Sequence, residues 1–250
     1  MSAHSSKPHS FGEPFIILPS VESTNNYAMA AIHAGLAKHG TSYFALEQTA
    51  GKGQRGKEWK STPGENIMLT VVIEPKGINP EQQFMFSVAI SLACYDFIKM
   101  VSGLPVAIKW PNDLYINDRK AGGILIENML RGEQWTYAVV GIGININQML
   151  FDPELKLATS LKLESQHHFE LLDISRTLLN SIENRYYQFE QNTEGLMDEY
   201  NHRLFKRDEE VRFRKNGKEI LAKIIGASAS GLLITHLGTF RHGEQEWLVE

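Results

Sequence analysis

The sequence has a single cysteine, Cys94, in 250 residues, so no disulfide can form within the chain. Long apolar runs are also missing: we find no stretch that approaches the ~20 apolar residues of a bilayer span, and we expect no membrane association. The N-terminus is polar and rich in His and Ser, without the apolar segment of a secretory signal. These absences favour the reducing environment of the cytoplasm.

An excess of basic charge is missing as well. The formal net charge is −4, which gives no bulk basic field of the kind that a dedicated nucleic-acid-binding protein carries. Only about 14 residues precede the first predicted strand, too few for a helix-turn-helix domain, so we expect no specific DNA binding. Apolar residues make up 42% and charged residues 22% of the chain, which is typical of a globular protein with one large domain, or one plus a small appendage.

The apolar pattern predicts an α+β fold in two parts. Strands and helices are mixed up to about residue 205, and short strands separated by turn residues follow, which is typical of a small β-barrel. We therefore expect a lead-in without order over 1–13, a main domain over 14–205 and a small domain over 206–250. The predicted strands of the main domain are 15–18, 43–48, 66–73, 106–110, 114–116, 124–127 and 137–140; the predicted helices are 27–36, capped by Thr24, then 79–103, 171–190 and 195–204; the strands of the small domain are 211–214, 218–225, 232–235 and 246–249.

The stretch Gly51 to Trp59 (GKGQRGKEW) predicts a binding site. It contains three glycines and three cations, and it has no apolar periodicity. Glycines let the backbone approach a ligand, successive N–H groups in such a turn form an anion-binding nest, and cations add charge-assisted hydrogen bonds to phosphate or carboxylate. We expect this glycine-rich loop to be mobile when empty and ordered by an anion. A solvated surface loop explains the stretch alone equally well, and it matches neither the P-loop nor the Rossmann pattern in context.

A second polar cluster lies in a predicted hairpin, where Lys109 to Asp113 and Arg119 to Gly123 can converge. Asp113 has the chemistry to hold a divalent metal or a sugar hydroxyl. Lys120 stands beside a Gly-Gly pair, where the backbone can approach a ligand closely. A lone lysine at a strand end is more often a solvated charge, but two cationic clusters around one sheet favour an ATP site that forms a mixed anhydride.

Six stretches, in order between about residues 20 and 150, make the chain resemble biotin protein ligases. They are Ser23-Thr24-Asn25, Gln48, Gly51 to Trp59, Lys109 to Asp113, Arg119 to Gly123, and Gly141 to Asn145. The resemblance implies a mixed-sheet catalytic domain similar to class II aminoacyl-tRNA synthetases and a C-terminal SH3-like β-barrel. It also implies a biotin–[biotin carboxyl-carrier protein] ligase: biotin and ATP give biotinyl-5′-AMP and pyrophosphate, and a lysine of the carrier protein then takes the biotinyl group. Mg²⁺ would neutralise the pyrophosphate, and the enzyme would be a monomer or weak homodimer.

The resemblance assigns catalytic roles to Lys120, Lys52 and Arg55. Lys120 is expected to bridge the biotin carboxylate and the α-phosphate and so offset the repulsion between two anions. Lys52 and Arg55 belong to the loop that is expected to close over the adenylate and exclude water. The implied biotin contacts are Ser23, Thr24, Asn25, Gln48, Gly51, Lys52, Lys120, Gly122 and Gly123. The implied ATP and adenylate contacts are Lys52, Gly53, Gln54, Arg55, Trp59, Asn112, Asp113, Lys120 and Asn145, with Asp113 also the candidate metal ligand.

Two positions depart from the family pattern, which commonly has arginine where this chain has Lys52 and Gln54. Lysine keeps the charge without the bidentate fork, and Gln54 loses the charge; we expect activity to survive on Lys52, Arg55 and Lys120. Ser23 and Thr24 can be explained by helix capping alone. A lipoate or octanoate ligase of the same architecture is an alternative, although its Arg-Arg-x-Gly-Gly-Gly motif is absent here. A non-catalytic biotin sensor is a second alternative, but a sensor needs no cations that handle phosphate.

Overall fold

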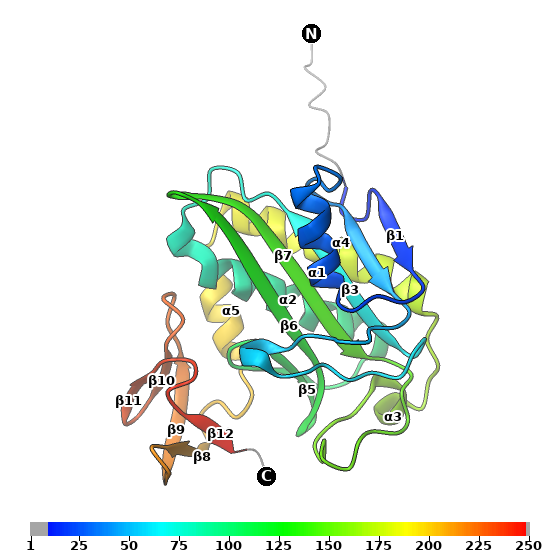
Figure 1. Cartoon of the computed structure of the whole chain (residues 1–250). Helices are drawn as coiled ribbons and strands as arrows, with labels where there is room; N and C mark the ends of the chain where they lie inside the picture. The colour runs from blue at the N-terminus through cyan, green and yellow to red at the C-terminus, as the bar shows by residue number, and fades with distance from the viewer. Residues whose placement is uncertain (1–9, 249–250) are drawn as a thin grey trace.

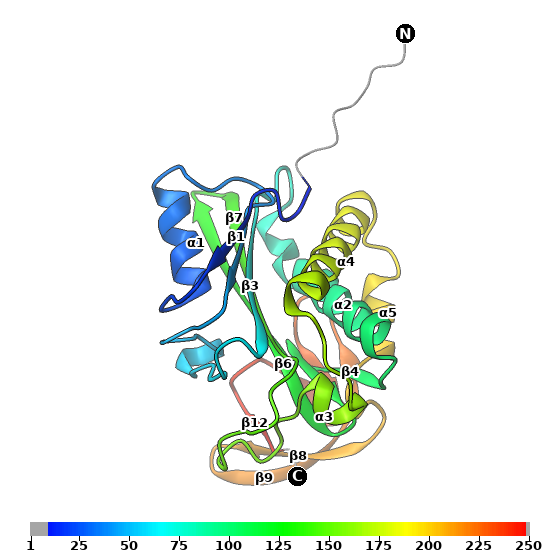
Figure 2. The same ribbon diagram turned by 90° about the vertical axis from the view of Figure 1, so that its right-hand side faces the viewer.

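A computed structural model describes residues Ser10 to Leu248. Its centre is a seven-stranded mixed sheet with α1 on one face and α2 and α4 on the other (Figures 1 and 2). The pair β1–β2 is parallel and the remaining neighbours are antiparallel. The α+β expectation with a mixed sheet is thereby confirmed. In spatial order the strands are β1 (Phe15–Leu18), β2 (Ser42–Ala45), β3 (Asn66–Ile73), β7 (Gln134–Asn145), β6 (Arg119–Arg131), β5 (Asp113–Ile116) and β4 (Val106–Lys109).

The long helix α2 (Gln83–Ser102) begins and ends where local signals predict. Asn79 caps a short 3₁₀ turn, Pro80–Gln82, with a full capping box, and α2 follows directly. Gly103 ends the helix in the left-handed conformation, with φ of 68°. The other helices are α1 (Thr24–His33), α3 (Leu161–Ser165), α4 (Leu171–Gln191) and α5 (Leu196–His202).

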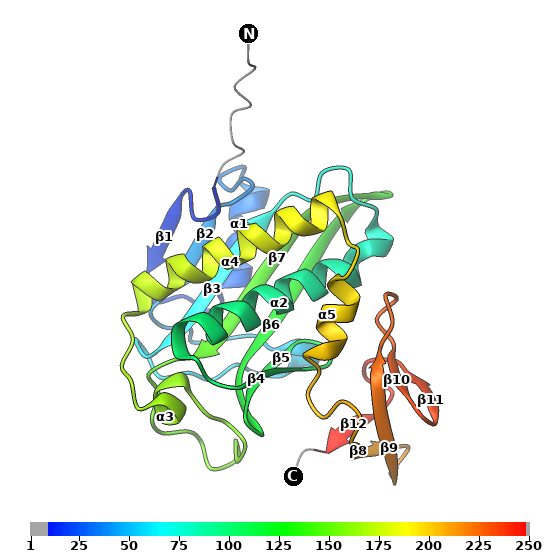
Figure 3. The same ribbon diagram turned by 180° about the vertical axis from the view of Figure 1, so that it is seen from behind.

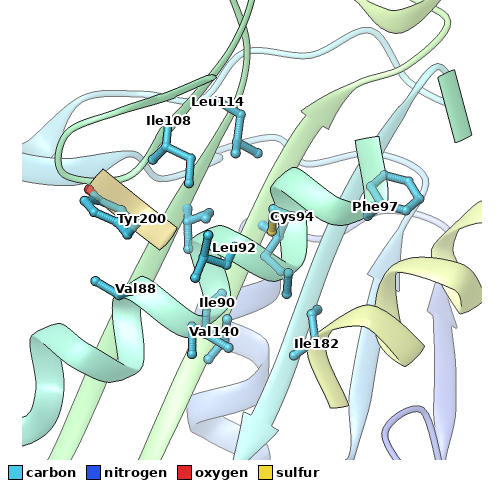
Figure 4. Close-up of a cluster of buried hydrophobic side chains, with 14 of the residues drawn as sticks. Val88, Ile90, Leu92, Cys94, Phe97, Ile108, Leu114, Val140, Ile182 and Tyr200 are labelled. Atoms are coloured by element: carbon cyan, nitrogen blue, oxygen red, sulfur yellow. The ribbon is translucent and has the colours of Figure 1, made fainter. Parts of the chain in front are cut away.

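The core is formed where α2 and α4 cross the sheet (Figure 3). Figure 4 shows its centre, where Leu92 and Cys94 of α2 lie among side chains of the sheet and of α4. Strand β3 is buried along its full length because α1 covers one face and α2 and α4 cover the other, which explains its unbroken apolar run. Burial raises the pKa of the Cys94 thiol well above its usual range, in keeping with core packing.

Among the described residues, one helical segment, Pro80–Ser102, is long and apolar enough by length and composition to cross a membrane. The expectation that no stretch approaches such a length is therefore wrong. The segment contains α2, and 61% of its most apolar window is buried inside the protein. The apolar side chains of this segment pack against both the sheet and α4.

The C-terminal part forms a separate five-stranded antiparallel sheet, in the order β11-β10-β9-β8-β12. It lies at the end of the central sheet near α5 and β5 (Figure 1). Its attachment includes the backbone on either side of Leu204, which exchanges hydrogen bonds with Ile108 of β4. The Asn201 side chain holds both backbone groups of Ala227. The strands are β8 (Glu210–Lys215), β9 (Lys218–Ala227), β10 (Leu233–Thr235), β11 (Gly238–Phe240) and β12 (Glu246–Leu248).

Several local predictions need correction. Ser23, not Thr24, is the N-cap residue of α1, and its side chain forms no cap hydrogen bond. The Thr24 hydroxyl donates to Gln48 instead. The predicted lead-in is too long: Phe11 is only 4% exposed and packs against His39, whereas residues 1–9 lie outside the described part. Strand β2 ends at Ala45, and the strands predicted over 124–127 and 137–140 extend to 13 and 12 residues because β6 and β7 pair along their length. Helix α3 and strand β11 were not predicted.

Replacing Leu92 by alanine tests this core. Leu92 is fully buried, so the cavity left behind is expected to lower the free energy of unfolding by about 2–5 kcal/mol. Met100→Ala on the same helix is the control, since its side chain is 68% exposed and its effect is expected to stay within about 0.5 kcal/mol. Urea denaturation measures both, and equal losses for the two variants would contradict the packing described.

Candidate active site

A cavity of about 740 Å³ is lined by the glycine-rich loop and by residues of the central sheet. Figure 2 shows this loop on the same side of the sheet as α1. The cavity brings together segments that are far apart in the sequence: the start of α1, the glycine-rich loop, the β4–β5–β6 hairpin, β7 and the β11–β12 loop. Fourteen of the sixteen predicted site residues line it. These are Ser23, Thr24, Asn25, Gln48, Lys52, Gly53, Gln54, Arg55, Trp59, Asn112, Asp113, Lys120, Gly123 and Asn145.

The two predicted residues that do not line the cavity are Gly51 and Gly122. A Cβ on Gly51 would collide with the carbonyl oxygen of Trp59, and one on Gly122 would lie 2.8 Å from the carbonyl oxygen of Gly143. Both glycines therefore allow close packing between backbones. Their biotin contacts, expected through the backbone, stay predictions.

A hydrogen-bonded network organises one end of the cavity around Gln48. Its amide oxygen accepts from the backbone N of Thr24 at 2.8 Å and from the Thr24 hydroxyl at 3.0 Å, so Gln48 caps α1 from outside the helix. The Thr70 hydroxyl oxygen lies 2.7 Å from both Thr24 Oγ1 and Asn25 Oδ1, and Asn25 donates to Glu127 at 2.8 Å. Thr70 is fully buried on β3 and was not predicted, because nothing local distinguishes it from its apolar neighbours.

The network leaves specific donors for a ligand. Within the described part of the chain, the Gln48 amide nitrogen and the Ser23 hydroxyl make no side-chain hydrogen bond, although both residues line the cavity. Asn25, by contrast, uses both ends of its amide inside the protein. It lines the cavity and also supports its neighbours, and its contact with biotin stays a prediction.

The glycine-rich loop is a closed hairpin. Trp59 donates from its backbone N to the Gly51 carbonyl at 2.8 Å, and Gly53 donates to the Lys57 carbonyl at 2.7 Å. These backbone donors are used within the loop, so the expected anion-binding nest does not form from them. The loop reaches towards the sheet edge through Lys52, whose ammonium lies 3.8 Å from the Glu127 carboxylate.

Two glycines of β7 form a flat floor beneath this loop. A Cβ on Gly143 would lie 2.5 Å from the Trp59 ring, and a Cβ on Gly141 would collide with the Asn25 side chain. The Trp59 indole nitrogen is buried and has no hydrogen-bond partner among the described residues. Alternate glycines in a strand are the sequence signal for such a close approach, and it applies to Gly141 and Gly143.

Lys120 and Asp113 form an ion pair on the hairpin, with 2.7 Å between Lys120 Nζ and Asp113 Oδ1. A β-bulge at Ala121 separates the Leu114–Gly122 pair from the Tyr115–Lys120 pair. The backbone of Lys120 is held by Leu157 and Thr159, so the base of this side chain is fixed from two sides.

The asparagines predicted as nucleotide contacts also have structural partners. Asn112 donates from its side chain to the carbonyl oxygen of Ile124, and Ile124 returns a backbone hydrogen bond at 3.1 Å. The Asn145 amide donates to the Thr159 carbonyl at 2.9 Å. Both residues therefore fix the wall of the cavity as well as line it.

Positive charge dominates the hairpin end of the cavity. Lys57 and Lys109 line it beside Lys120 and Arg55, and Asp113 already shares an oxygen with Lys120. Burial lowers the pKa of Lys109, and although Asp113 acts in the opposite direction, Lys120 and Lys57 lower it further. An anion bound here would relieve this repulsion. The described residues contain no group of three or more His, Cys, Asp or Glu side chains that could hold a metal ion.

The C-terminal sheet completes the cavity, which the sequence did not predict. The Lys109 ammonium lies 5.0 Å from the centre of the Trp247 ring, and the His242 ring packs edge-on against Trp110 at 5.5 Å. No local pattern marks this segment as part of a site. The C-terminal residues that line the cavity are Phe213, Arg214, His242, Gly243, Glu244, Gln245, Glu246 and Trp247.

The model of the biotin/lipoate A/B protein ligase family matches residues 17–145, which is more than half of the chain. The chain belongs to this family. The matched segment contains every one of the predicted site residues, whereas the C-terminal wall of the cavity lies beyond it.

Named relatives agree with the family assignment. The chain is 31% identical over 183 residues to the bifunctional ligase/repressor BirA of Bacillus spizizenii, covering 72% of this chain and 56% of that protein. It is 37% identical over 133 residues to the biotin–[acetyl-CoA-carboxylase] ligase of Paracoccus denitrificans, covering 52% of this chain and 53% of that protein. The chain thus spans about half the length of the curated relatives it matches first.

Among solved structures, the biotin protein ligase of Aquifex aeolicus in complex with biotin and ATP is similar over the whole fold. Its TM-score is 0.78 at 25% sequence identity, and the match covers 94% of this chain and 98% of that one. The match therefore includes residues of the C-terminal sheet in addition to the central sheet.

Replacing Gly143 by alanine tests the floor of the cavity. The new methyl group would occupy the position of the Trp59 indole, so we expect the emission of Trp59 to shift to the red and stability to fall by about 1–3 kcal/mol. The difference in fluorescence between each protein and its Trp59→Phe counterpart isolates this signal. Gly123→Ala is the matched control: Gly123 lies opposite Gly143 in the sheet, and its Cβ would meet nothing closer than 3.4 Å. An unshifted Trp59 in Gly143→Ala would show that the indole does not rest there.

Proposed function

We propose that this chain is an ATP-dependent biotin protein ligase that acts through biotinyl-5′-AMP. The observation that carries the proposal is the group of cations around Asp113 at one end of a cavity whose other end is neutral and polar. A carboxylic acid and a nucleotide triphosphate are both anions, and an enzyme that joins them must offset their repulsion. The names of the relatives from Paracoccus denitrificans and Aquifex aeolicus support the same activity.

The neutral end suits the head of biotin. The Gln48 amide nitrogen and the Ser23 hydroxyl are directed donors for a urea-type oxygen, and the Thr24–Thr70 network holds them in place. Trp59 packs on the flat floor at Gly143 and lines the cavity with its ring, while its indole N–H is buried. We assign this ring to the adenine, because a purine stacks on an aromatic face.

The charged end suits the reacting groups. In the first step a carboxylate oxygen of biotin bonds to the α-phosphorus, the bond from that phosphorus to the β-phosphate oxygen breaks, and pyrophosphate leaves. In this proposal Lys120 leaves Asp113 and bridges the two reacting anions, and Lys109, Lys57 and Arg55 stabilise the charge on the pyrophosphate. In the second step an amine of the carrier lysine attacks the acyl carbon, AMP leaves, and the amine loses a proton.

Mg²⁺ would enter with the phosphates. The described residues have no cluster that could hold the ion without substrate, and Asp113 is the carboxylate that lies beside Lys120. This donor set fits the usual mode of Mg²⁺, which is bound through one or two carboxylates together with substrate phosphates. The ion would supply charge neutralisation for the leaving pyrophosphate.

The remaining assignments belong to the same proposal. The acceptor would be a biotin carboxyl carrier protein, the catalytic part would be related to class II aminoacyl-tRNA synthetases, and the C-terminal sheet would be an SH3-like barrel. Cytoplasmic location, a monomer or weak homodimer, and the absence of DNA binding stay predictions.

Pyrophosphate release tests the proposal. With ATP present, we expect release that depends on biotin and falls by about 10²–10³-fold in Lys120→Ala, the usual loss when a group that stabilises the transition state is removed. Lys218→Ala, on an exposed strand end of the C-terminal sheet, is the control and is expected to retain full activity.

Two alternative functions give different results in the same assay. Release with lipoate and none with biotin would identify the enzyme as a lipoate or octanoate ligase. A protein that binds biotin but releases no pyrophosphate would be a sensor. Either result would refute the proposed activity.

A further inference from the structure

The β11–β12 loop, Arg241 to Gln245, places a glycine against the glycine-rich loop of the cavity. Its turn is closed by the hydrogen bond from Glu244 N to the Arg241 carbonyl at 3.1 Å and by the bridge between His242 and Gln245. Gly243 stands at the tip with φ of 90°, a conformation that L-residues rarely adopt. This loop lies well outside the segment that the family model matches.

Gly243 leaves space that the Arg55 side chain fills. A Cβ built on Gly243 would coincide with Arg55 Nη1, and the next nearest atoms are Cζ and Nη2 of the same guanidinium, the latter at 2.8 Å. The guanidinium therefore occupies the volume in which any residue other than glycine would place its side chain. The guanidinium packs against Gly243 without a hydrogen bond, so this contact does not occupy the N–H donors of Arg55.

Apart from Gly243, few contacts hold the Arg55 side chain in place. Its own backbone has φ of 56°, in the left-handed region that costs a non-glycine residue about 1–2 kcal/mol. In the part of the chain that the structure describes, its guanidinium makes no hydrogen bond and no ion pair. Five donors thus remain available for a bound anion, and Gly243 is the residue against which this exposed guanidinium lies.

Contacts on either side of the Arg241–Gln245 loop attach it to the central sheet. The His242 ring packs on Trp110, Trp247 receives the Lys109 ammonium on its face, and the Asn201 amide ties the C-terminal sheet to α5. Partial desolvation lowers the pKa of His242, and Arg55, Lys109 and Lys57 lower it further while Asp113 raises it. His242 is therefore kept neutral beside the cations at neutral pH and adds no repulsion of its own.

We infer that Gly243 is a positioning residue for Arg55, and that the Arg241–Gln245 loop thereby holds the glycine-rich loop over the phosphate end of the cavity. The C-terminal sheet then contributes to catalysis through the backbone conformation of the Arg241–Gln245 loop. A side chain at position 243 would displace the Arg55 guanidinium from its place against this loop. The claim that Arg55 faces phosphate rests on the proposed function. The claim that Gly243 positions Arg55 does not.

Limited proteolysis tests the seating without any substrate. Trypsin cleaves after arginine, and a restrained Arg55 is a poor site. In Gly243→Ala we expect cleavage after Arg55, identified by mass spectrometry, to become about tenfold faster, because residues in direct contact couple by energies of that order. Gly238→Ala is the matched control: Gly238 also has a positive φ, of 116°, in the same sheet, and its Cβ would meet nothing within 4 Å.

The reciprocal variant covers the case in which Gly243→Ala does not fold. In Arg55→Ala, the Arg241–Gln245 loop loses its partner, and we expect faster cleavage after Arg241. Equal cleavage rates in Gly243→Ala and Gly238→Ala, or an unchanged Arg241 site in Arg55→Ala, would overturn the inference.

A double-mutant cycle tests the consequence for catalysis. We expect Gly243→Ala to lower kcat/KM for ATP about tenfold in the wild-type background and to have no further effect in the Arg55→Ala background, since the glycine acts through the arginine. An equal loss in both backgrounds would show that Gly243 acts through general stability instead. If the wild type releases no pyrophosphate with biotin, the proposed function fails, and the proteolysis comparison still decides whether Gly243 seats Arg55.

Discussion

An excess of positive charge at one end of the cavity is the constraint on which the site depends. Lys109, Lys57 and Arg55 face a space in which Asp113 is already paired with Lys120. Burial disfavours the charged form of Lys109, and it lowers the pKa of this side chain together with Lys120 and Lys57. Like charges stay this close only where the surrounding fold holds them in place, and a bound anion would lower their repulsion. The anion that binds there therefore determines the function of the site.

The fold supplies the required rigidity from elements that are distant in the sequence. Backbone contacts from the 157–159 segment fix Lys120, the flat floor of β7 lets the Trp59 indole lie close to the sheet, and Gln48 joins the start of α1 to the end of β2. The C-terminal sheet adds the last wall through His242 and Gly243. A site with these properties requires both sheets.

Local signals explain which features the sequence predicted. Helix α2 has its cap and proline at one end and Gly103 at the other, and β3 is apolar because both of its faces are covered. The glycine-rich loop and Lys120 stand out by their residue types, whereas the other site residues and all of their roles were assigned by the resemblance to biotin protein ligases. Features that depend on distant partners could not be predicted. Thr70 is one unremarkable threonine in an apolar strand, and nothing near Gly243 indicates that Arg55 fills its missing side chain.

The central claim is that this cavity joins biotin to adenylate, and the bound product tests it most directly. Native mass spectrometry of the protein after mixing with biotin and ATP is expected to show a complex with the mass of biotinyl-5′-AMP, which is absent when lipoate replaces biotin and absent in Lys120→Ala. A wild-type protein that carries only ATP or only biotin under saturating amounts of both would contradict the claim.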